Sequence, residues 1–337
     1  MKAARYHRGE DHLRIEEVET PSPRLSEVVV KVRAAGVCHT DLHFLEGAMK
    51  SPDVITLGHE IAGDVAEVGE GISKDWVGER VIVNNCVPCG NCEQCREGRG
   101  NLCDNLFQLG FSADGGYAEY VRIRADCALP MGRIPYEEGA ALTCGAASCY
   151  HALMDLAKVK LGDTVLINGM GGLGFSALQI AQLAGARTIV VDVVQPKLDL
   201  AMREFGADFI VNGTKANVAE EVRTITKGRG ADIILELVGI SKTMSYGIDA
   251  LAKRGRMVLV GHTNDEFSVL PLKMIKKEAS VLSSVAYRAT DLVAARDLAA
   301  SGKLRPLIGE RYRLDQVNEA LQELRKGTVM GRSVLTF

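Results

Sequence analysis

The sequence has few aromatic residues, no excess of positive charge and no apolar stretch among its first residues. Aromatic residues make up 5% of its 337 residues, and its formal net charge is −3. Proteins that bind nucleic acids or anionic membranes present clustered basic residues, and single-strand binders add aromatic platforms, so we expect neither kind of partner. The first residues, MKAARYHRGEDHLRIEEVE, are charged from the start, which predicts no secretory signal.

A long hydrophobic run is also nearly missing. The stretch 164–186 carries no charge, but it contains five glycines together with Asn168, Gln179 and Gln182. These residues predict a strand, a glycine loop and a helix, not a membrane span.

Cysteine, in contrast, is plentiful, with nine residues. Without a secretory signal, this number predicts a reducing compartment, and we expect a cytoplasmic protein. Clustered cysteines in such a compartment are more often metal ligands or catalytic groups than disulfides.

The length favours two domains, because one hydrophobic core seldom organises so many residues. Up to residue 149, short apolar runs such as EVVVKVRAAGV and GERVIVNN are broken by Gly and Asn, which predicts an irregular, mostly antiparallel, barrel-like domain. Over 150–285, apolar strands alternate with amphipathic helices, which predicts a doubly wound parallel sheet. We expect the helix 290–304 and the terminal strand GRSVLTF to return to the first domain, so that 286–337 completes it. The predicted fold class is α/β.

A glycine-rich loop, GMGGLG at 169–174, follows the predicted strand TVLIN and opens a helix. Gly169, Gly171 and Gly174 fit the G-x-G-x-x-G pattern, which allows a tight turn and close approach of a pyrophosphate to the helix N-terminus. The next strand reaches Asp192, at the offset of the acidic residue that binds an adenosine ribose and repels a 2′-phosphate. The pattern predicts NAD in preference to NADP. The alternative is that the glycines serve only a helix–strand crossing and that Asp192 is a turn residue.

One short loop holds four regularly spaced cysteines. Cys89, Cys92 and Cys95 have the spacing C-x2-C-x2-C, and Cys103 follows after seven residues. Four thiolates around Zn²⁺ leave no position for a substrate, so the spacing predicts a structural zinc site. An iron–sulfur cluster would have its fourth cysteine sooner, followed by Pro. A redox or disulfide role remains the alternative.

A second group of potential ligands is dispersed: Cys38 in GVCHTDLH, His59 and Glu60 in GHEIAG, and Cys144 in LTCGAASC. Each has an ordinary explanation as a packing cysteine or a hydrogen-bonded histidine. Together, Cys38, His59 and Cys144 would give zinc three protein ligands and one open position, which is the catalytic pattern. Spacing alone does not show that they converge.

These motifs resemble those of the zinc-dependent alcohol dehydrogenases of the medium-chain dehydrogenase/reductase family. The similarity covers essentially the whole chain: CHTDLH at 38–43, GHEIAGDVAEVG at 58–69, the four-cysteine loop, GMGGLG and GRSVLTF occur in the family's order. It implies a GroES-like catalytic domain, a Rossmann domain and a homodimer or homotetramer.

The resemblance implies a role for each matching residue. Cys38, His59 and Cys144 would bind the catalytic zinc, with Glu60 beside it and Asp41 accepting a hydrogen bond from the His59 imidazole. The second of the two zinc ions would be bound by Cys89, Cys92, Cys95 and Cys103. The NAD contacts would come from the loop and three further residues: Gly169, Gly171, Gly172, Leu173, Gly174, Asp192, Lys197 and Arg332.

The implied reaction is hydride transfer between a primary or secondary alcohol and NAD. Thr40 would take a hydrogen bond from the alcohol, and His43 would pass the proton on through the cofactor ribose; alternatively, they are a helix cap and a surface histidine. Asn85 stands where many relatives have a bulky aromatic residue, which would leave the alcohol pocket wider and more polar. Polyol dehydrogenases of the same fold often have a carboxylate as the third ligand, unlike Cys144. A non-catalytic nucleotide-binding protein is the alternative from another class, and the intact ligand set argues against it.

Overall fold

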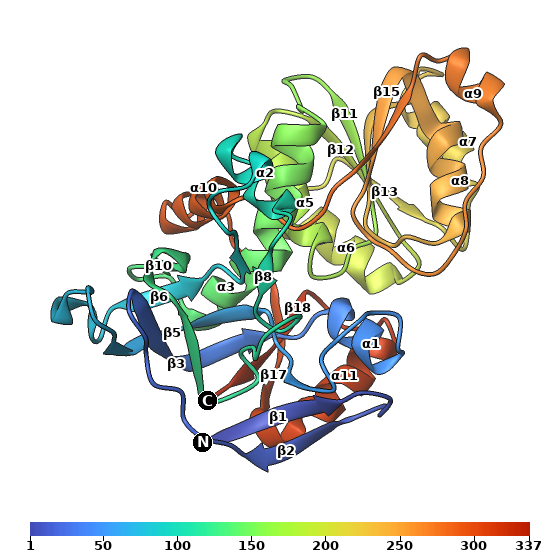
Figure 1. The fold of residues 1–337 in the computed structure, drawn as a ribbon. Coiled ribbons are helices and arrows are strands. Elements are labelled where there is room, and N and C mark those ends of the chain that lie inside the picture. Colours follow the sequence, from blue (N-terminus) through green and yellow to red (C-terminus); the bar gives the residue numbers. More distant parts are fainter. The chain divides into compact units, whose positions relative to one another are not determined.

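The computed structural model describes residues 1–337, and the chain divides into two compact units (Figure 1). The first unit comprises Met1–Ala147 and Ala286–Phe337, and the second comprises Ser148–Val285. Each unit is described separately below.

The first unit is built on a seven-stranded sheet in the order β10-β6-β5-β3-β18-β17, with β9 also paired to β3. Its strands are β3 (Glu27–Gly36), β5 (Glu60–Val68), β6 (Arg80–Val83), β9 (Tyr120–Arg124), β10 (Ala128–Pro130), β17 (Ile308–Arg313) and β18 (Arg332–Thr336). All of these pairings are antiparallel except β17 with β18. The terminal strand β18 pairs with β3, so the end of the chain completes the sheet begun by its start.

Two smaller sheets accompany it, one of three strands in the order β2-β1-β4 and one formed by β7 and β8. Their bounds are β1 (Lys2–His7), β2 (Leu13–Glu17), β4 (Val54–Thr56), β7 (Cys86–Val87) and β8 (Phe107–Gln108). The helices of this unit are α1 (His39–Leu45), α2 (Glu93–Arg96), α3 (Tyr136–Ala141), α10 (Ala289–Ala300) and α11 (Val317–Arg325). Short 3₁₀ turns cover Lys74–Trp76, Gly100–Leu102, Ala125–Cys127 and Leu314–Gln316.

The core of the first unit follows from alternation along its central strand. In β3, Val28, Val30 and Val32 are fully buried and belong to one cluster with residues of β5, β6 and α11, while on the other face Lys31 is exposed and Val29 is buried outside this cluster. Side chains on successive strand residues point to opposite faces, so this pattern fixes which face of β3 packs inward.

The second unit contains a six-stranded, entirely parallel sheet in the order β13-β12-β11-β14-β15-β16 (Figure 1). The strands are β11 (Thr164–Asn168), β12 (Arg187–Asp192), β13 (Phe209–Asn212), β14 (Ala231–Glu236), β15 (Leu251–Leu259) and β16 (Ser280–Ser283). The helices are α4 (Ser148–Tyr150), α5 (Gly174–Leu183), α6 (Gln195–Arg203), α7 (Val218–Ile225), α8 (Ser241–Ala250) and α9 (Pro271–Ile275). Every residue of β11 is buried, as expected for a central strand covered on both faces. The predicted fold class is confirmed.

Strand β15 differs from the sequence prediction, and two helical turns were not predicted. Strand β15 begins at Leu251, before the expected GRMVLVG, and shifts its register against β14 near Arg254, whose φ is 60°. A widened, π-helical turn covers Leu142–Ala147, and another covers His151–Leu156. The first of these turns is almost completely buried, so it lacks the amphipathic period by which a helix is predicted.

The uncharged stretch 164–186 forms strand β11, the glycine loop and helix α5. No helix of the protein combines the length and apolar character that a membrane span requires.

Candidate metal centres and cofactor loop

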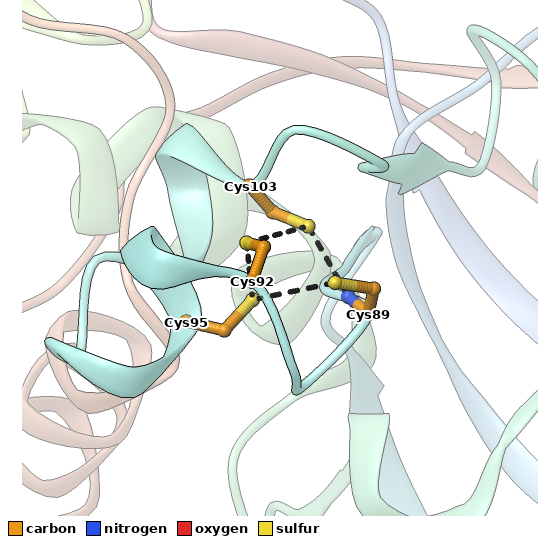
Figure 2. A group of neighbouring side chains, drawn as sticks. All are labelled: Cys89, Cys92, Cys95 and Cys103. Atoms are coloured by element: carbon orange, nitrogen blue, oxygen red, sulfur yellow. Dashed lines mark hydrogen bonds between the residues drawn. The ribbon is translucent and has the colours of Figure 1, made fainter.

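The four cysteines of the loop converge on one point, as Figure 2 shows. The Cys92 sulfur lies 3.5 Å from that of Cys95 and 3.8 Å from that of Cys103, and the Cys89 and Cys95 sulfurs are 3.9 Å apart. Tetrahedral zinc with bonds of about 2.3 Å places its sulfur ligands about 3.8 Å apart. The thiols are not joined in disulfides. We call this group the four-cysteine lobe; its geometry fits zinc.

Backbone groups of the lobe favour thiolates. The amide groups of Cys89 and Asn105 both donate to the sulfur of Cys103, at 3.2 and 3.3 Å. Backbone hydrogen bonds from Asn91 and then Cys92 lower the pKa of Cys89 to about 6. The thiolate is the form that binds metals, so the lowered pKa favours metal binding by Cys89.

A second group brings together Cys38, His59, Glu60 and Cys144, whose ligand atoms all lie within 4.8 Å of one another. We call it the mixed cluster. Cys38 is the N-cap of α1, immediately after β3, and Glu60 opens β5. The ladder between these strands pairs Gly36 with Glu60, which brings Cys38 and His59 side by side.

Gly36 makes room for this arrangement. A Cβ atom at this position would lie 1.9 Å from the Glu60 Oε2 atom, so any larger residue would displace the carboxylate. The fourth member, Cys144, lies in the widened helical turn Leu142–Ala147. Such turns are frequent at functional sites.

The mixed cluster is buried, yet several of its polar atoms have no hydrogen-bond partner. His59 and Glu60 are 2% and 0% exposed, and neither ring nitrogen of His59 and neither carboxylate oxygen of Glu60 makes a hydrogen bond, although Asp41 and Arg332 lie within ion-pair distance. Buried polar atoms are normally satisfied, and exceptions require an explanation such as an ion. Two sulfurs, an imidazole nitrogen and an adjacent carboxylate are ligands that suit zinc. These residues therefore fit a metal ion.

The charges around this cluster are strongly coupled. The neighbouring Cys144 thiol is the largest cause that lowers the pKa of Cys38 well below its usual range; burial opposes this, and Arg332 and His59 add to it. Burial raises the pKa of Glu60 to about 7, against the opposing effect of the Arg332 guanidinium. Cys38 is therefore the thiol of the cluster that ionises first.

Asp41 lies behind His59, as the resemblance implies. Its Oδ1 atom is 3.4 Å from the His59 Nδ1 atom, while its Oδ2 atom accepts a hydrogen bond of 3.0 Å from the Cys38 amide. The Asp41 carboxylate thus faces the predicted ligand His59. It also caps helix α1, which begins directly after the predicted ligand Cys38.

The two residues predicted to move a proton lie on the same helix. The Thr40 Oγ1 atom is 3.7 Å from the Cys38 sulfur. The His43 Nδ1 atom is 3.7 Å from a Glu46 carboxylate oxygen, and its side chain is 16% exposed. Thr40 is thus next to a predicted ligand, and His43 is close to solvent.

Arg332, expected to contact a pyrophosphate, lies against Glu60. Its Nε atom is 3.2 Å from the Glu60 Oε2 atom, and its Nη1 atom donates to the Val37 carbonyl oxygen at 3.0 Å. Its Nη2 atom has no partner. The pyrophosphate contact stays a prediction.

The glycine loop of the second unit is a tight turn that leaves no room for side chains at its two ends. Gly169 has a φ of 102°, and a Cβ atom at Gly174 would lie 2.2 Å from the Gly169 carbonyl oxygen. At Gly171, nothing lies within 4 Å of a Cβ position. Gly172 and Leu173 complete the loop before α5. The turn thus requires glycine at Gly169 and Gly174, whereas the space next to Gly171 is not filled by other atoms.

Asp192 ties this loop to the end of β12. Its Oδ2 atom accepts from the Met170 amide at 2.7 Å and its Oδ1 atom from the Val194 amide at 2.8 Å. A carboxylate has about four acceptor positions, so two remain for ribose hydroxyls. Lys197 is buried nearby, and burial lowers its pKa while the charge of Asp192 opposes this.

Several residues at these sites were not predicted from the sequence. The Tyr117 hydroxyl contacts Asp41, and the Tyr287 hydroxyl donates to the Asn85 Oδ1 atom at 2.8 Å. Asn85, expected to leave a wide and polar pocket wall, is itself buried with this aromatic neighbour. Neither tyrosine lies in a recognisable motif, so only the tertiary fold identifies them.

A buried carboxylate beside the glycine loop was also missed. Glu236 ends β14, and its Oε1 atom accepts from the amides of Val238 and Gly239 at 2.9 and 2.8 Å and from the Thr243 hydroxyl at 3.0 Å. Its other oxygen accepts from Asn168, at the end of β11. An acidic residue at the carboxyl end of a parallel strand was the available signal.

Comparisons with known proteins identify the family of the chain. Residues 24–133 match the family model "Alcohol dehydrogenase GroES-like domain", and residues 172–301 match "Zinc-binding dehydrogenase". The chain is 34% identical to an NAD-dependent alcohol dehydrogenase of Sulfurisphaera tokodaii, over 99% of both chains. It is 32% identical to a sorbitol dehydrogenase of Halalkalibacterium halodurans, over 97% of both.

Among solved structures, an alcohol dehydrogenase from Aeropyrum pernix superimposes with a TM-score of 0.93 at 34% identity, over the full length of both chains. This agreement covers both units and both family models. The chain belongs to the zinc-dependent alcohol dehydrogenases of the medium-chain dehydrogenase/reductase family.

Proposed function

We propose that the protein transfers hydride between a primary or secondary alcohol, or the corresponding aldehyde or ketone, and NAD at a zinc centre. The observation that carries this proposal is the mixed cluster: two cysteines, a histidine and a glutamate that meet in a buried site with unsatisfied polar atoms. The full-length similarity to proteins named NAD-dependent alcohol dehydrogenase supports it.

Cys38, His59 and Cys144 would hold the catalytic zinc. Zinc in such a site supplies Lewis-acid polarisation, which lowers the pKa of the substrate hydroxyl group. Asp41 orients the His59 ring, and Glu60 provides a carboxylate that Arg332 partly neutralises at 3.2 Å. The four-cysteine lobe would hold a second, structural zinc with a closed shell.

The proton released from the alcohol would leave along α1. Thr40, beside Cys38, would accept a hydrogen bond from the substrate hydroxyl through its Oγ1 atom. His43, whose Nδ1 atom lies 3.7 Å from a Glu46 carboxylate oxygen, would pass the proton on.

The cofactor would be held by Gly169, Gly171, Gly172, Leu173, Gly174, Asp192, Lys197 and Arg332. NAD supplies the acceptor for the hydride. The loop offers backbone amides and a helix N-terminus to the pyrophosphate. Asp192 would accept hydrogen bonds from the ribose hydroxyls and repel a 2′-phosphate, which favours NAD.

A polyol is the second candidate substrate, because one full-length relative is named sorbitol dehydrogenase. The third predicted ligand, Cys144, favours the simple alcohol instead. Small alcohols and carbonyl compounds are in either case the substrate class.

We infer that the protein forms a homodimer or homotetramer through the second unit. Strand β16 ends the parallel sheet and leaves one edge unpaired. Apolar side chains around it are exposed: Leu270, Leu272, Ile275, Val281 and Val285. An unpaired edge flanked by apolar residues suits pairing with a second copy about a two-fold axis.

We also infer a cytoplasmic location. All nine cysteines are free, including four whose sulfurs lie close enough to interact, which suits a reducing compartment.

The test is reduction of NAD⁺ and NADP⁺ with short aliphatic, branched secondary, benzylic and polyol substrates, together with zinc analysis. We expect turnover with NAD⁺ and about two zinc ions per chain. Preference for NADP⁺ would contradict the role given to Asp192. No turnover with any substrate, despite two bound zinc ions, would contradict the proposed activity.

A further inference from the structure

The Asp41 carboxylate is held from behind by a tyrosine that belongs to no motif. The Tyr117 hydroxyl lies 2.7 Å from the Asp41 Oδ2 atom and 3.1 Å from the Gly36 carbonyl oxygen. Both side chains are completely buried. A phenol has one proton to donate and is protonated at neutral pH, so the shorter contact, to the carboxylate, is the main hydrogen bond.

Tyr117 is fixed in place independently of this hydrogen bond. Its amide donates to the Leu57 carbonyl oxygen at 3.0 Å, and the Gly116 amide donates to the Gly58 carbonyl oxygen at 2.7 Å. A Cβ atom on Gly58 would lie 2.4 Å from the Tyr117 ring, so the ring packs directly on the backbone that precedes His59. The hydroxyl position is therefore set by rigid neighbours on both sides.

The Asp41 carboxylate consequently has its two oxygens divided between different tasks. Oδ2 accepts from Tyr117 and from the Cys38 amide, while Oδ1 faces the His59 Nδ1 atom and has no other partner. Two fixed donors on one oxygen restrict rotation of the carboxylate and direct the other oxygen at the imidazole. Partners behind a metal-binding histidine fix its orientation and its tautomer.

We propose that Tyr117 is a positioning residue of the mixed cluster: its hydroxyl holds Asp41, and Asp41 holds the His59 imidazole in the orientation that binds zinc. This inference rests on the proposed zinc centre. It predicts that removal of a single oxygen atom, outside the ligand shell, weakens metal retention at this cluster and leaves the four-cysteine lobe unaffected.

The test compares the holoenzyme with the variants Tyr117→Phe and Tyr312→Phe. Tyr117→Phe keeps the ring that packs on Gly58 and removes only the hydroxyl. Tyr312 is a matched control: it is 8% exposed in the same unit, its hydroxyl makes no hydrogen bond, and its charged neighbours are Glu323, Glu310, Glu319 and Lys326. Zinc release is followed with excess chromophoric chelator and is expected in two kinetic phases, one for each site. The phase that belongs to the four-cysteine lobe is the one that is missing in Cys95→Ala.

Mutation of residues that hydrogen-bond to metal ligands typically lowers metal affinity by about 10- to 100-fold. Tyr117 is one contact further from the metal, so we expect Tyr117→Phe to release zinc from the mixed cluster roughly 3- to 10-fold faster. The lobe phase and the Tyr312→Phe protein should release zinc at the wild-type rate. With Co²⁺ exchanged into the mixed cluster, the visible absorption bands should shift in Tyr117→Phe and not in Tyr312→Phe.

Equal release rates and equal cobalt spectra would overturn the inference. Faster release from both sites, with a lowered melting temperature, would also overturn it, because it would indicate general loss of the fold. If the wild-type protein holds zinc only in the lobe, both the proposed centre and this inference fail. Two zinc ions with an unaffected Tyr117→Phe variant would overturn this inference alone.

Discussion

The four-cysteine lobe and the mixed cluster place their ligand atoms at similar separations, within 4.8 Å, but in different surroundings. The lobe comes from one segment, Cys89–Cys103, and three of its four cysteines are partly exposed. The mixed cluster draws on residues from 38 to 144 and is almost fully buried. Similar spacing of ligands therefore does not imply a similar task.

The donors explain the difference. Four thiolates overcompensate the charge of a divalent ion and close its shell, whereas two thiolates and a neutral imidazole balance that charge and leave a position open. The mixed cluster also contains a carboxylate, Glu60, which forms a buried ion pair of 3.2 Å with the Arg332 guanidinium. Reactivity is thus expected at the second site and rigidity at the first.

The largest expected effect is loss of activity in Cys144→Ala. Lewis-acid polarisation contributes several kcal/mol to the transition state, so kcat/KM should fall by about 10³-fold or more. Zinc content should fall from about two ions to about one per chain. Steady-state kinetics and metal analysis measure both, with Cys127→Ala, a buried cysteine outside both clusters, as the control. Retained activity in the zinc-depleted variant would remove the distinction between the clusters.

Cys95→Ala should show the opposite pattern. The lobe loses its zinc and its local fold, and we expect the melting temperature to fall by about 10 °C, which corresponds to several kcal/mol. Well below that temperature, kcat should stay close to the wild-type value. Calorimetry and kinetics at low temperature are the measurements. A loss of kcat as large as that of Cys144→Ala would show that the lobe takes part in the reaction.

Asp41→Asn tests whether the Asp41 carboxylate orients His59 in the mixed cluster. The amide cannot accept from the Cys38 amide, Tyr117 and His59 as the carboxylate does, so zinc affinity of the mixed cluster should fall by about 10- to 100-fold. Competition with a chelator of known affinity measures this, and the lobe affinity serves as the internal standard. Parallel changes at both sites would argue against a specific role.

The smallest expected effect concerns pH in zinc-stripped protein. Burial raises the pKa of Glu60 from 4.5 to about 7, so the folded state binds a proton more readily than the unfolded state. The resulting stabilisation is complete below pH 4.5 and is lost as the pH rises through about 7. Melting temperatures should therefore decline by a few degrees over this range, and Glu60→Gln should flatten the decline. An identical slope in the variant would assign the dependence to other groups.

The fold class and the family were predictable from the sequence, and both are confirmed. Apolar strands alternating with helices identified the parallel sheet, and GMGGLG identified its first crossover loop. The helical turns around Cys144 were not predictable, because residues buried on all sides lose the periodic pattern of a surface helix. Strand β15 began earlier than expected because a register shift near Arg254 interrupts its apolar pattern.

One of the two candidate metal sites was predictable from the sequence, and the other was predictable only in part. The lobe could be predicted from spacing, since a short loop limits how far its cysteines can separate. For the mixed cluster, the motifs supplied candidates, but their convergence depends on the pairing of Gly36 with Glu60 between β3 and β5. The metal, relay and cofactor roles of the individual residues stay predictions until the variants are measured.

By itself, the sequence determined which ligand groups are available. The lobe thiols, the loop glycines and Asp192 lie in short segments whose conformations are restricted. Only the tertiary structure decided that Cys38, His59, Glu60 and Cys144 meet, and that Tyr117 stands behind Asp41. The physical reason is that strand register and burial, set by the packing of the whole unit, bring together residues that no local pattern relates.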